Sequence, residues 1–93
     1  MAPGSLRLSV VVPTHDTREL ALRCLGTLGR AMAAGAEVVL VDDGSRDDTA
    51  AAVGDRFPAA RVLRREVAAG FTVSANDGLQ DARGDVLLLL NSD

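Results

Sequence analysis

Four short apolar segments, separated by segments of helical character, constrain the fold of this chain more than any other feature. The first two are almost continuously apolar, which is typical of strands buried on both faces of a parallel sheet. The four predicted strands are residues 6–12, 38–41, 60–64 and 85–90. Pro13 follows the first strand and is expected to end it.

The segments between the strands predict three helices. In the first, which Asp16 or Thr17 would cap, apolar residues recur at helical spacing until Gly35 stops it. These residues are Leu20, Cys24, Leu25, Leu28 and Met32. The other helices are predicted from Asp47 or Asp48 to about Arg56, and from about Thr72 to Arg83. The βαβαβαβ order predicts an α/β fold, with an open, mostly parallel, doubly wound, Rossmann-like sheet of strand order 3-2-1-4.

Composition excludes several classes of function. The 93 residues suffice for one domain, and 47% of them are hydrophobic, which is enough for a folded core. The net charge is −3, the largest basic cluster is Arg64–Arg65, and the only aromatic residues are two phenylalanines. These features argue against nucleic acid as a partner. The longest apolar run, residues 86–90, is too short to cross a bilayer, so no transmembrane segment is expected.

Cys24 is the only cysteine, so no intrachain disulfide can form and a reduced compartment fits. Its place on the apolar side of the first helix favours a buried structural thiol over a reactive one. We therefore expect a cytoplasmic protein, either free or peripheral to the cytoplasmic face of the membrane.

Polar motifs follow three of the four predicted strands. They are "PTHD" at residues 13–16, "DDGS" at residues 42–45 and "NSD" at residues 91–93. Each motif alone is more typical of a turn or of the surface, because aspartate before Gly-Ser commonly bonds its own backbone. In an open parallel sheet, however, ligands bind beyond the carboxyl ends of the strands, where the strand order reverses. The three motifs together therefore predict a polar binding crevice at that edge.

The chemistry of such a crevice suits a nucleotide and a metal ion. A carboxylate can accept the N–H of a pyrimidine base or bind ribose hydroxyls, while another holds a divalent cation. Mg²⁺ and Mn²⁺ prefer oxygen ligands, and Mg²⁺ often binds through one or two carboxylates and the phosphates of the substrate. Neither G-x-G-x-x-G nor G-x-x-x-x-G-K-[ST] occurs in the chain. Phosphate bound through a metal is therefore the more consistent scheme.

The segments "LSVVVPTHD", "EVVLVDDGSRDDT" and "GFTVSANDGLQDARGDVLLLLNSD" resemble, in order and spacing, those of family 2 glycosyltransferases. The resemblance covers residues 8–93. Within the family, the chain is similar to the rhamnosyltransferase-like or cell-wall glycan branch. The resemblance implies the nucleotide-sugar-binding, Rossmann-like half of the GT-A fold. The implied activity is metal-dependent, inverting transfer of a sugar from a UDP- or dTDP-sugar, in glycan, cell-wall or exopolysaccharide synthesis. The acceptor, whether a glycan, a lipid or another molecule, stays unknown.

The resemblance also implies roles for individual residues. Pro13 and Thr14 would shape the nucleoside pocket, and either Asp42 or Asp43, with Asp43 preferred, would recognise the base. Two further nucleotide-binding positions and two metal-binding positions follow from the same comparison. Asn76 would lie near the nucleotide and Gly70 would allow close backbone approach, while Asp93 would bind Mg²⁺ or Mn²⁺ with Asn91 in the first position of the motif.

Three residues depart from the pattern of the family. His15 replaces an aromatic residue, Asp16 replaces an asparagine, and Asn91 is neutral where many relatives have an aspartate. The catalytic base of the family lies downstream of the D-x-D region, so we expect it beyond Asp93. We also expect residues 1–5 to be disordered and residues 6–93 to be an incomplete, nucleotide-sugar-binding part of a longer protein. Its last strand would then be left partly exposed, which would promote self-association.

Three alternatives stay open at this point. A receiver-like signalling domain would match the acidic pair, but the chain has no lysine and a strand and a helix precede the pair. A non-catalytic nucleotide-binding fragment differs from the enzyme only in what the remainder of the protein would do. A nucleotidyltransferase would more often show a glycine-rich loop with a basic residue near the N-terminus.

Overall fold

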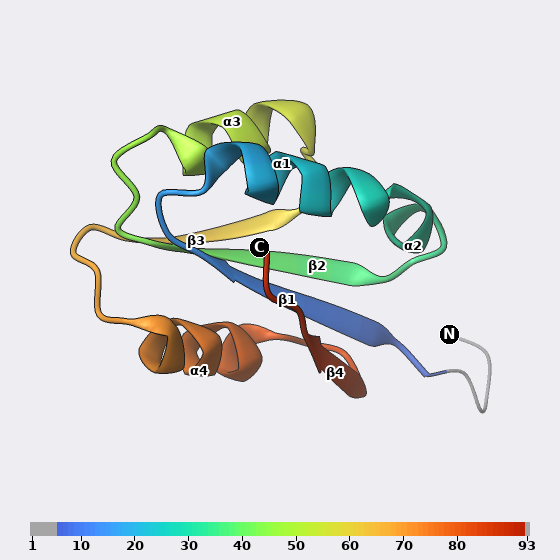
Figure 1. Cartoon of the computed structure of the whole chain (residues 1–93). Helices are drawn as coiled ribbons and strands as arrows, with labels where there is room; N and C mark the ends of the chain where they lie inside the picture. The colour runs from blue at the N-terminus through green and yellow to red at the C-terminus, as the bar shows by residue number, and fades with distance from the viewer. Residues whose placement is uncertain (1–5, 93) are drawn as a thin grey trace.

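The computed structural model describes residues 6–92, and its strands and helices alternate along the chain (Figure 1). The elements are β1 (Leu8–Thr14), α1 (Arg18–Thr27), α2 (Gly29–Ala33), β2 (Glu37–Asp43), α3 (Thr49–Arg56), β3 (Arg61–Arg65), α4 (Phe71–Asp81) and β4 (Val86–Leu89). The expectation that residues 1–5 are disordered lies outside the described residues. Among those described, no helix has the length and apolar character needed to span a membrane.

The four strands form one parallel sheet in the order β3-β2-β1-β4, which confirms the predicted topology. The helices α1, α2 and α3 lie on one side of this sheet and α4 lies on the other (Figure 1). The connection from β3 through α4 to β4 therefore carries the chain from one edge of the sheet to the other. The reversal of strand order lies at β1, which has β2 on one side and β4 on the other.

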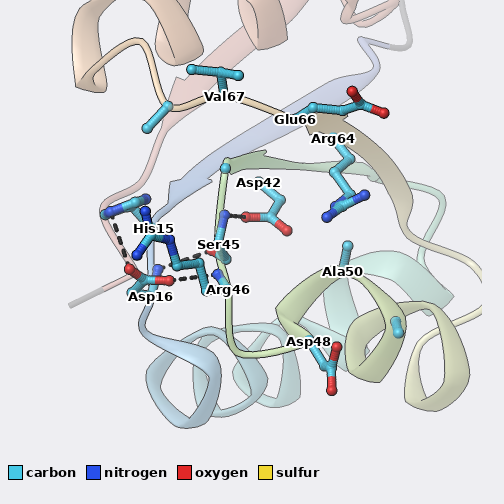
Figure 2. A pocket seen from close by; sticks show the side chains of 13 residues that line it. His15, Asp16, Asp42, Ser45, Arg46, Asp48, Ala50, Arg64, Glu66 and Val67 are labelled. Carbon is cyan, nitrogen blue, oxygen red and sulfur yellow. Dashed lines mark hydrogen bonds and ion pairs between the residues drawn. The ribbon is translucent and has the colours of Figure 1, made fainter.

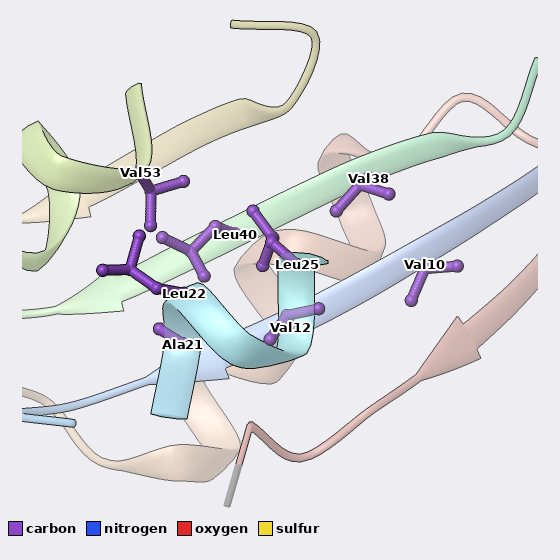
Figure 3. Packing of buried hydrophobic residues seen from close by; sticks show 8 residues of the cluster. All are labelled: Val10, Val12, Ala21, Leu22, Leu25, Val38, Leu40 and Val53. Atoms are coloured by element: carbon purple, nitrogen blue, oxygen red, sulfur yellow. The ribbon is translucent and has the colours of Figure 1, made fainter. Parts of the chain in front are cut away.

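Two apolar layers hold the helices to the sheet, because successive side chains of a strand point to opposite faces. Figure 3 shows the layer under α1 and α3. It consists of Val10, Val12, Ala21, Leu22, Leu25, Val38, Leu40 and Val53. The layer on the α4 side consists of Val11, Val39 and Val41, with Leu63, Leu79 and Ala82 packed against them.

Gly78 allows α4 to lie directly on the sheet. A Cβ atom at this position would lie 2.3 Å from Val11 Cγ1 and 2.8 Å from Val41 Cγ2, much closer than carbon atoms pack. Any larger residue would therefore push α4 away from β1 and β2, and with it the loop that leads into this helix.

The predicted single helix through Met32 is wrong in one respect, because α1 ends at Thr27 and α2 begins at Gly29. Leu28 between them has φ −95° and ψ 2°, and its N–H donates to the carbonyl of Leu25. Gly26 and Gly29 flank this break, and glycine is a poor helix former. In α1, Ala21, Leu22 and Leu25 face the core, whereas Leu20, expected on that face, is 38% exposed.

Cys24 is half-buried against the core layer under α1, and this burial raises the pKa of its thiol. A raised pKa reduces the fraction of reactive thiolate. The structural interpretation of this cysteine agrees with both observations.

The expectation that Pro13 ends the first strand is also wrong, because β1 continues to Thr14. Pro13 pairs with Val41 of β2, whereas the pairing of β1 with β4 ends at Val11 and Leu89. In a parallel ladder the N–H and C=O of one residue point to the same neighbour. Val11 accepts a bond from Leu90, so Pro13, two residues later, also points toward β4. Its missing N–H therefore removes no bond to β2.

The side chains of β4 are half-exposed, from 39% at Leu89 to 46% at Leu88. Its sequence is apolar at every position, as for a strand covered on both faces. The partial exposure that was expected for this strand is therefore present in the described chain.

Candidate functional site

Two neighbouring cavities open at the carboxyl ends of the strands. The larger, of about 940 Å³, lies beside the turn that follows β2. The smaller, of about 210 Å³, is lined by residues at or after the ends of β1, β2 and β4 and by the start of α4. His15 lines both cavities. This edge includes the point where strand order reverses, which is where open α/β sheets bind their ligands.

Asp42 anchors the turn after β2. It is only 1% exposed, and its Oδ1 accepts the N–H of Ser45 at 3.0 Å, a contact drawn in Figure 2. Gly44 in the same turn has a φ of +67°, and a Cβ atom there would lie 2.5 Å from the backbone nitrogen of Ala68. The turn is therefore closed tightly against the segment before α4, and Asp42 has the local backbone contact that is typical of turns.

Asp43 ties the end of β2 to the start of α4. Its Oδ1 accepts the N–H of Ala69 at 2.8 Å, and its Oδ2 accepts the N–H of Gly70 at 2.9 Å. Burial by itself would raise the pKa of Asp43, but these two backbone donors hold it below its ordinary value. Asp43 is therefore ionised at neutral pH and presents a fixed negative charge on the wall of the smaller cavity.

Gly70 is the residue that makes this arrangement possible at the helix start. It is the N-cap of α4 and has φ +101° and ψ 164°, a conformation that is essentially restricted to glycine. A Cβ atom at Gly70 would meet no heavy atom within 4 Å. The requirement for glycine here is therefore conformational, and the space beside it is open.

Asp47 joins the acidic turn to two helices. It accepts the N–H of Arg18 at 3.0 Å and the N–H of Thr49 at 3.2 Å, so it satisfies donors at the starts of α1 and α3. Burial would raise the pKa of Asp47, but the hydroxyl and N–H of Thr49 and the N–H of Arg18 lower it. Asp48 is the residue at the N-cap position of α3 and makes no side-chain capping bond there.

The smaller cavity brings together four of the predicted site residues, from the ends of three strands. Pro13 and Thr14 come from β1, Asp43 from β2 and Asn91 from the segment after β4. The hydroxyl of Ser92 lies 3.4 Å from that of Thr14, which connects the last described segment to β1. The predicted convergence of strand ends is therefore present for the described residues.

The other described candidates lie outside the smaller cavity, with Asp42 on the wall of the larger one and Gly70 lining neither. Asn76 lies on an exposed part of α4 and lines neither cavity. Asp93, the expected metal ligand, lies outside the described residues. Among residues 6–92, no group of three or more histidine, cysteine, aspartate or glutamate side chains could hold a metal ion.

Phe71, Ser74 and Ser92 line the smaller cavity but were not candidates in the sequence. Phe71 and Ser74 are three residues apart in the first turns of α4, so they lie on one face of it. Their spacing directly after Gly70 is a signal that could have indicated them. Ser92 follows from its position inside the "NSD" motif.

The comparisons with known proteins agree with this geometry. The family model described as Glycosyl transferase family 2 matches residues 9–93. This chain belongs to glycosyltransferase family 2. The family match sets aside the receiver-like alternative, and the chain corresponds to the N-terminal portion of such an enzyme.

Three similar proteins define the extent of the match. Glycosyltransferase GlyG of Streptococcus pneumoniae is 31% identical over 90 residues, which cover 92% of this chain and 30% of that protein. Mannosyltransferase PcManGT from Pyrobaculum calidifontis, solved in complex with GDP-Man and Mn²⁺, superposes with a TM-score of 0.81 at 26% identity. The match covers 98% of this chain and 28% of PcManGT.

The structure of Staphylococcus aureus TarS 1-349 superposes with a TM-score of 0.83 at 29% identity and covers 94% of this chain and 27% of that one. These structural neighbours are GT-A glycosyltransferases, so the fold of this family 2 chain is the Rossmann-like part of the GT-A fold. The chain spans about 30% of the length of GlyG.

Proposed function

We propose that residues 6–93 are the donor-binding part of a metal-dependent, inverting glycosyltransferase that uses a UDP- or dTDP-sugar. The observation that carries this proposal is Asp43, a buried and ionised carboxylate at the end of β2, on the wall of a cavity shared with Thr14 and Asn91. The product would belong to glycan, cell-wall or exopolysaccharide synthesis. The acceptor class, glycan or lipid, is left open.

Asp43 has the capacity to bind a nucleoside as well as its own loop. An ionised carboxylate offers about four lone-pair positions. The N–H groups of Ala69 and Gly70 occupy one position on each oxygen. Arg65 Nε also lies 3.8 Å from Oδ1, so Oδ2 has the more open position. That position can accept the imide N–H of uracil or thymine, or a ribose hydroxyl, as a charge-assisted hydrogen bond. Thr14 and Pro13 would then form the adjacent wall of the nucleoside site.

The residues after β4 fit a hard divalent cation. The amide of Asn91 and the carboxylate of Asp93 both supply oxygen ligands, which Mg²⁺ and Mn²⁺ prefer. Mg²⁺ usually needs only one or two protein carboxylates, because waters and substrate phosphates complete its shell. A bound cation would neutralise charge on the departing diphosphate. The presence of Mn²⁺ with GDP-Man in PcManGT supports a divalent metal.

The reaction would be a single displacement at the anomeric carbon. An acceptor oxygen forms the new bond, the bond to the diphosphate breaks, and a base removes the acceptor proton. We assign the base to none of the described residues and expect it downstream of Asp93. Asn76 and Gly70 stay predicted nucleotide-binding residues. The assignment to the rhamnosyltransferase-like branch of the family also stays a prediction. The lone thiol Cys24 supports action in the reduced cytoplasm, free or at the face of the membrane.

Isothermal titration calorimetry with UDP, dTDP and GDP, each with and without Mn²⁺, tests the proposal. We expect UDP or dTDP to bind, and Mn²⁺ to strengthen the binding. Asp43→Asn should weaken nucleotide binding by about tenfold or more, with or without metal, because a hydrogen bond to a charged group is worth about 1.5–3 kcal/mol.

The matched control is Asp55→Asn, the same change of charge on an exposed part of α3 outside both cavities. It should leave binding unchanged. Equal affinities for the parent and the two variants would place the nucleotide away from Asp43 and contradict the proposal. Circular dichroism of each variant separates lost binding from lost folding.

A further inference from the structure

Two bridges of the same composition connect β2, β3 and α4, one at each end of the strands. Each bridge has a carboxylate of β2, an arginine of β3 and an aspartate of α4. The members at the amino edge of the sheet are Glu37, Arg61 and Asp81, and those at the carboxyl edge are Asp43, Arg65 and Asp77. Because side chains alternate along a strand, both arginines lie on the same side of the sheet as Leu63, which packs on the α4 side.

The bridge at the amino edge is closed by hydrogen bonds. Oε2 of Glu37 accepts a hydrogen bond from Arg61 Nη1 at 3.1 Å. Oε1 of the same carboxylate accepts the hydroxyl of Ser9 and the N–H of Arg83, each at 2.8 Å. Both oxygens are therefore engaged within the fold, which is what a purely structural bridge requires.

The bridge at the carboxyl edge is built differently. Arg65 pairs with Asp43 in the register of β2 and β3, and its Nε lies 3.8 Å from Asp43 Oδ1, an ion-pair contact that is too long for a hydrogen bond. Within residues 6–92 this Nε is buried and has no hydrogen-bond partner. Nη1 of the same guanidinium donates to Asp77 Oδ2, which holds the group against α4. Arg65 therefore compensates the charge of Asp43 from the Oδ1 side and leaves a position on Oδ2 open.

Asp43 needs a compensating charge, and Arg65 supplies it from outside the smaller cavity. Asp43 is only 5% exposed, and burial disfavours the ionised form of a carboxyl group. Arg65 lines a different cavity, of about 410 Å³, together with Asp77, and it is not among the residues that line the smaller cavity. Its effect on a ligand in the smaller cavity must therefore pass through Asp43.

We propose that Arg65 is a positioning residue for donor binding, whose guanidinium, anchored to Asp77, stabilises the charge and the orientation of Asp43 without occupying the oxygen that binds the nucleoside. This inference rests on the proposed function of Asp43. The two bridges thus use the same three types of residue for different ends: the one at Glu37 holds the fold together, and the one at Asp43 keeps a carboxylate ready for a ligand.

Calorimetric titration with UDP of the parent chain, Arg65→Gln and Arg61→Gln tests the proposal. The Arg65 side chain is 34% exposed, so water screens part of its charge, and Arg65→Gln should weaken UDP binding by about threefold to fivefold. Arg61→Gln is the matched control, since it makes the same change in the equivalent bridge at the other end of β3. It should lower the urea midpoint at least as much, because Arg61 bonds both Glu37 and Asp81, yet leave the UDP affinity unchanged.

A conservative variant and a second ligand separate a positioning role from other effects. Arg65→Lys keeps the positive charge and should retain most of the UDP affinity. Uridine lacks the diphosphate, so a residue that acts through Asp43 should affect uridine and UDP by the same factor. Nuclear magnetic resonance titration measures the weaker binding of uridine to the parent chain and to Arg65→Gln.

The outcomes distinguish this inference from the proposed function. If Asp43→Asn weakens UDP binding and Arg65→Gln does not, the inference is wrong and the proposed function stands. Equal losses in Arg65→Gln and Arg61→Gln would trace the effect to stability alone, and a loss confined to UDP would mean that Arg65 acts on the diphosphate; either result overturns the inference. Failure of UDP to bind the folded parent chain would count against the proposed function, and the inference would fall with it.

The lysine variant keeps the test decisive if Arg65→Gln does not fold. An affinity of Arg65→Lys close to that of the parent chain supports the role of the charge at this position. A loss as large as that of Asp43→Asn, in a folded Arg65→Lys chain, would overturn it.

Discussion

At the scale of single residues, the acidic turn after β2 depends on one glycine and one carboxylate. Asp42 fixes the turn through the N–H of Ser45, and Gly44 lets the segment around Ala68 pack against it. The neighbouring Asp43 then reaches Ala69 and Gly70. Two adjacent aspartates therefore differ in role: the first closes the turn, and the second connects the turn to α4 and lines the cavity.

Gly44→Ala should lower the free energy of unfolding by about 2 kcal/mol or more, because a left-handed residue with a Cβ costs about 1–2 kcal/mol before any clash. The contact at 2.5 Å from the nitrogen of Ala68 adds to this cost. Gly26→Ala is the control, since Gly26 lies in α1 with open space around it. It should raise the stability by about 0.5–1 kcal/mol. Urea denaturation of both variants measures this, and equal effects would refute the role given to the Gly44 conformation.

At the scale of elements, Glu37 connects four parts of the fold at the amino edge of the sheet. From the start of β2 its carboxylate accepts the hydroxyl of Ser9 in β1 at 2.8 Å and the guanidinium of Arg61 in β3 at 3.1 Å. It also accepts the N–H of Arg83, between α4 and β4, at 2.8 Å. Arg61 in turn contacts the carboxylate of Asp81 at the end of α4.

Burial would raise the pKa of Glu37, but the N–H of Arg83, the hydroxyl of Ser9 and the charge of Arg61 together lower it. A lowered pKa contributes stability that is complete above the unfolded value, about 4.3, and is lost as pH falls through the folded value. Glu37→Gln should therefore cost about 1–3 kcal/mol at pH 7. The difference from the parent should shrink below about pH 4.

The measurement is urea unfolding at pH 7 and at pH 3.5. Glu66→Gln is the control, since Glu66 is exposed and lies outside the elements, and it should change little at either pH. A difference between Glu37→Gln and the parent that stays constant down to pH 3.5 would mean that the carboxylate does not supply the pH dependence.

The elements were largely predictable because each strand and helix carries its own periodicity. The order of the sheet and the meeting of Thr14, Asp43 and Asn91 followed from the rule for open α/β sheets. The break at Leu28 was not predictable from apolar spacing, since Leu28 and Met32 still pack against the core after it. The contacts of Asp43 with Ala69 and Gly70 were not predictable either, because they join segments that are far apart in sequence. The distance between these segments depends on how closely α4 packs on the sheet, which Gly78 allows.

At the scale of the whole molecule, the edge strand β4 is apolar, and proteins usually cover such a strand with other elements. β4 pairs with β1 on one side only, and all four of its apolar side chains are half-exposed. Such an edge can pair with another chain, and its faces can bury apolar area in doing so. We therefore expect the 93-residue chain to associate with itself as its concentration rises.

Leu88→Lys should reduce this association, because lysine on an edge strand opposes pairing between edges. Val67→Lys is the control, since Val67 is 79% exposed in the loop before α4 and its change leaves β4 intact. Sedimentation velocity over a range of concentrations measures both. A parent chain that stays monomeric throughout, or a Val67→Lys variant that dissociates equally, would show that β4 is not the contact surface.

Pro13 has a consequence for the shape of the sheet that extends beyond β1. The next rung between β1 and β4 would require an N–H of Pro13 donated to the carbonyl of Leu90, and proline has no such hydrogen. The pairing of β1 with β4 therefore cannot extend further, and Asn91 and Ser92 leave the sheet at this point. Pro13, Asn91 and Ser92 all line the smaller cavity, so the proline ring that stops the pairing of β1 with β4 also keeps the two chain segments apart where this cavity lies.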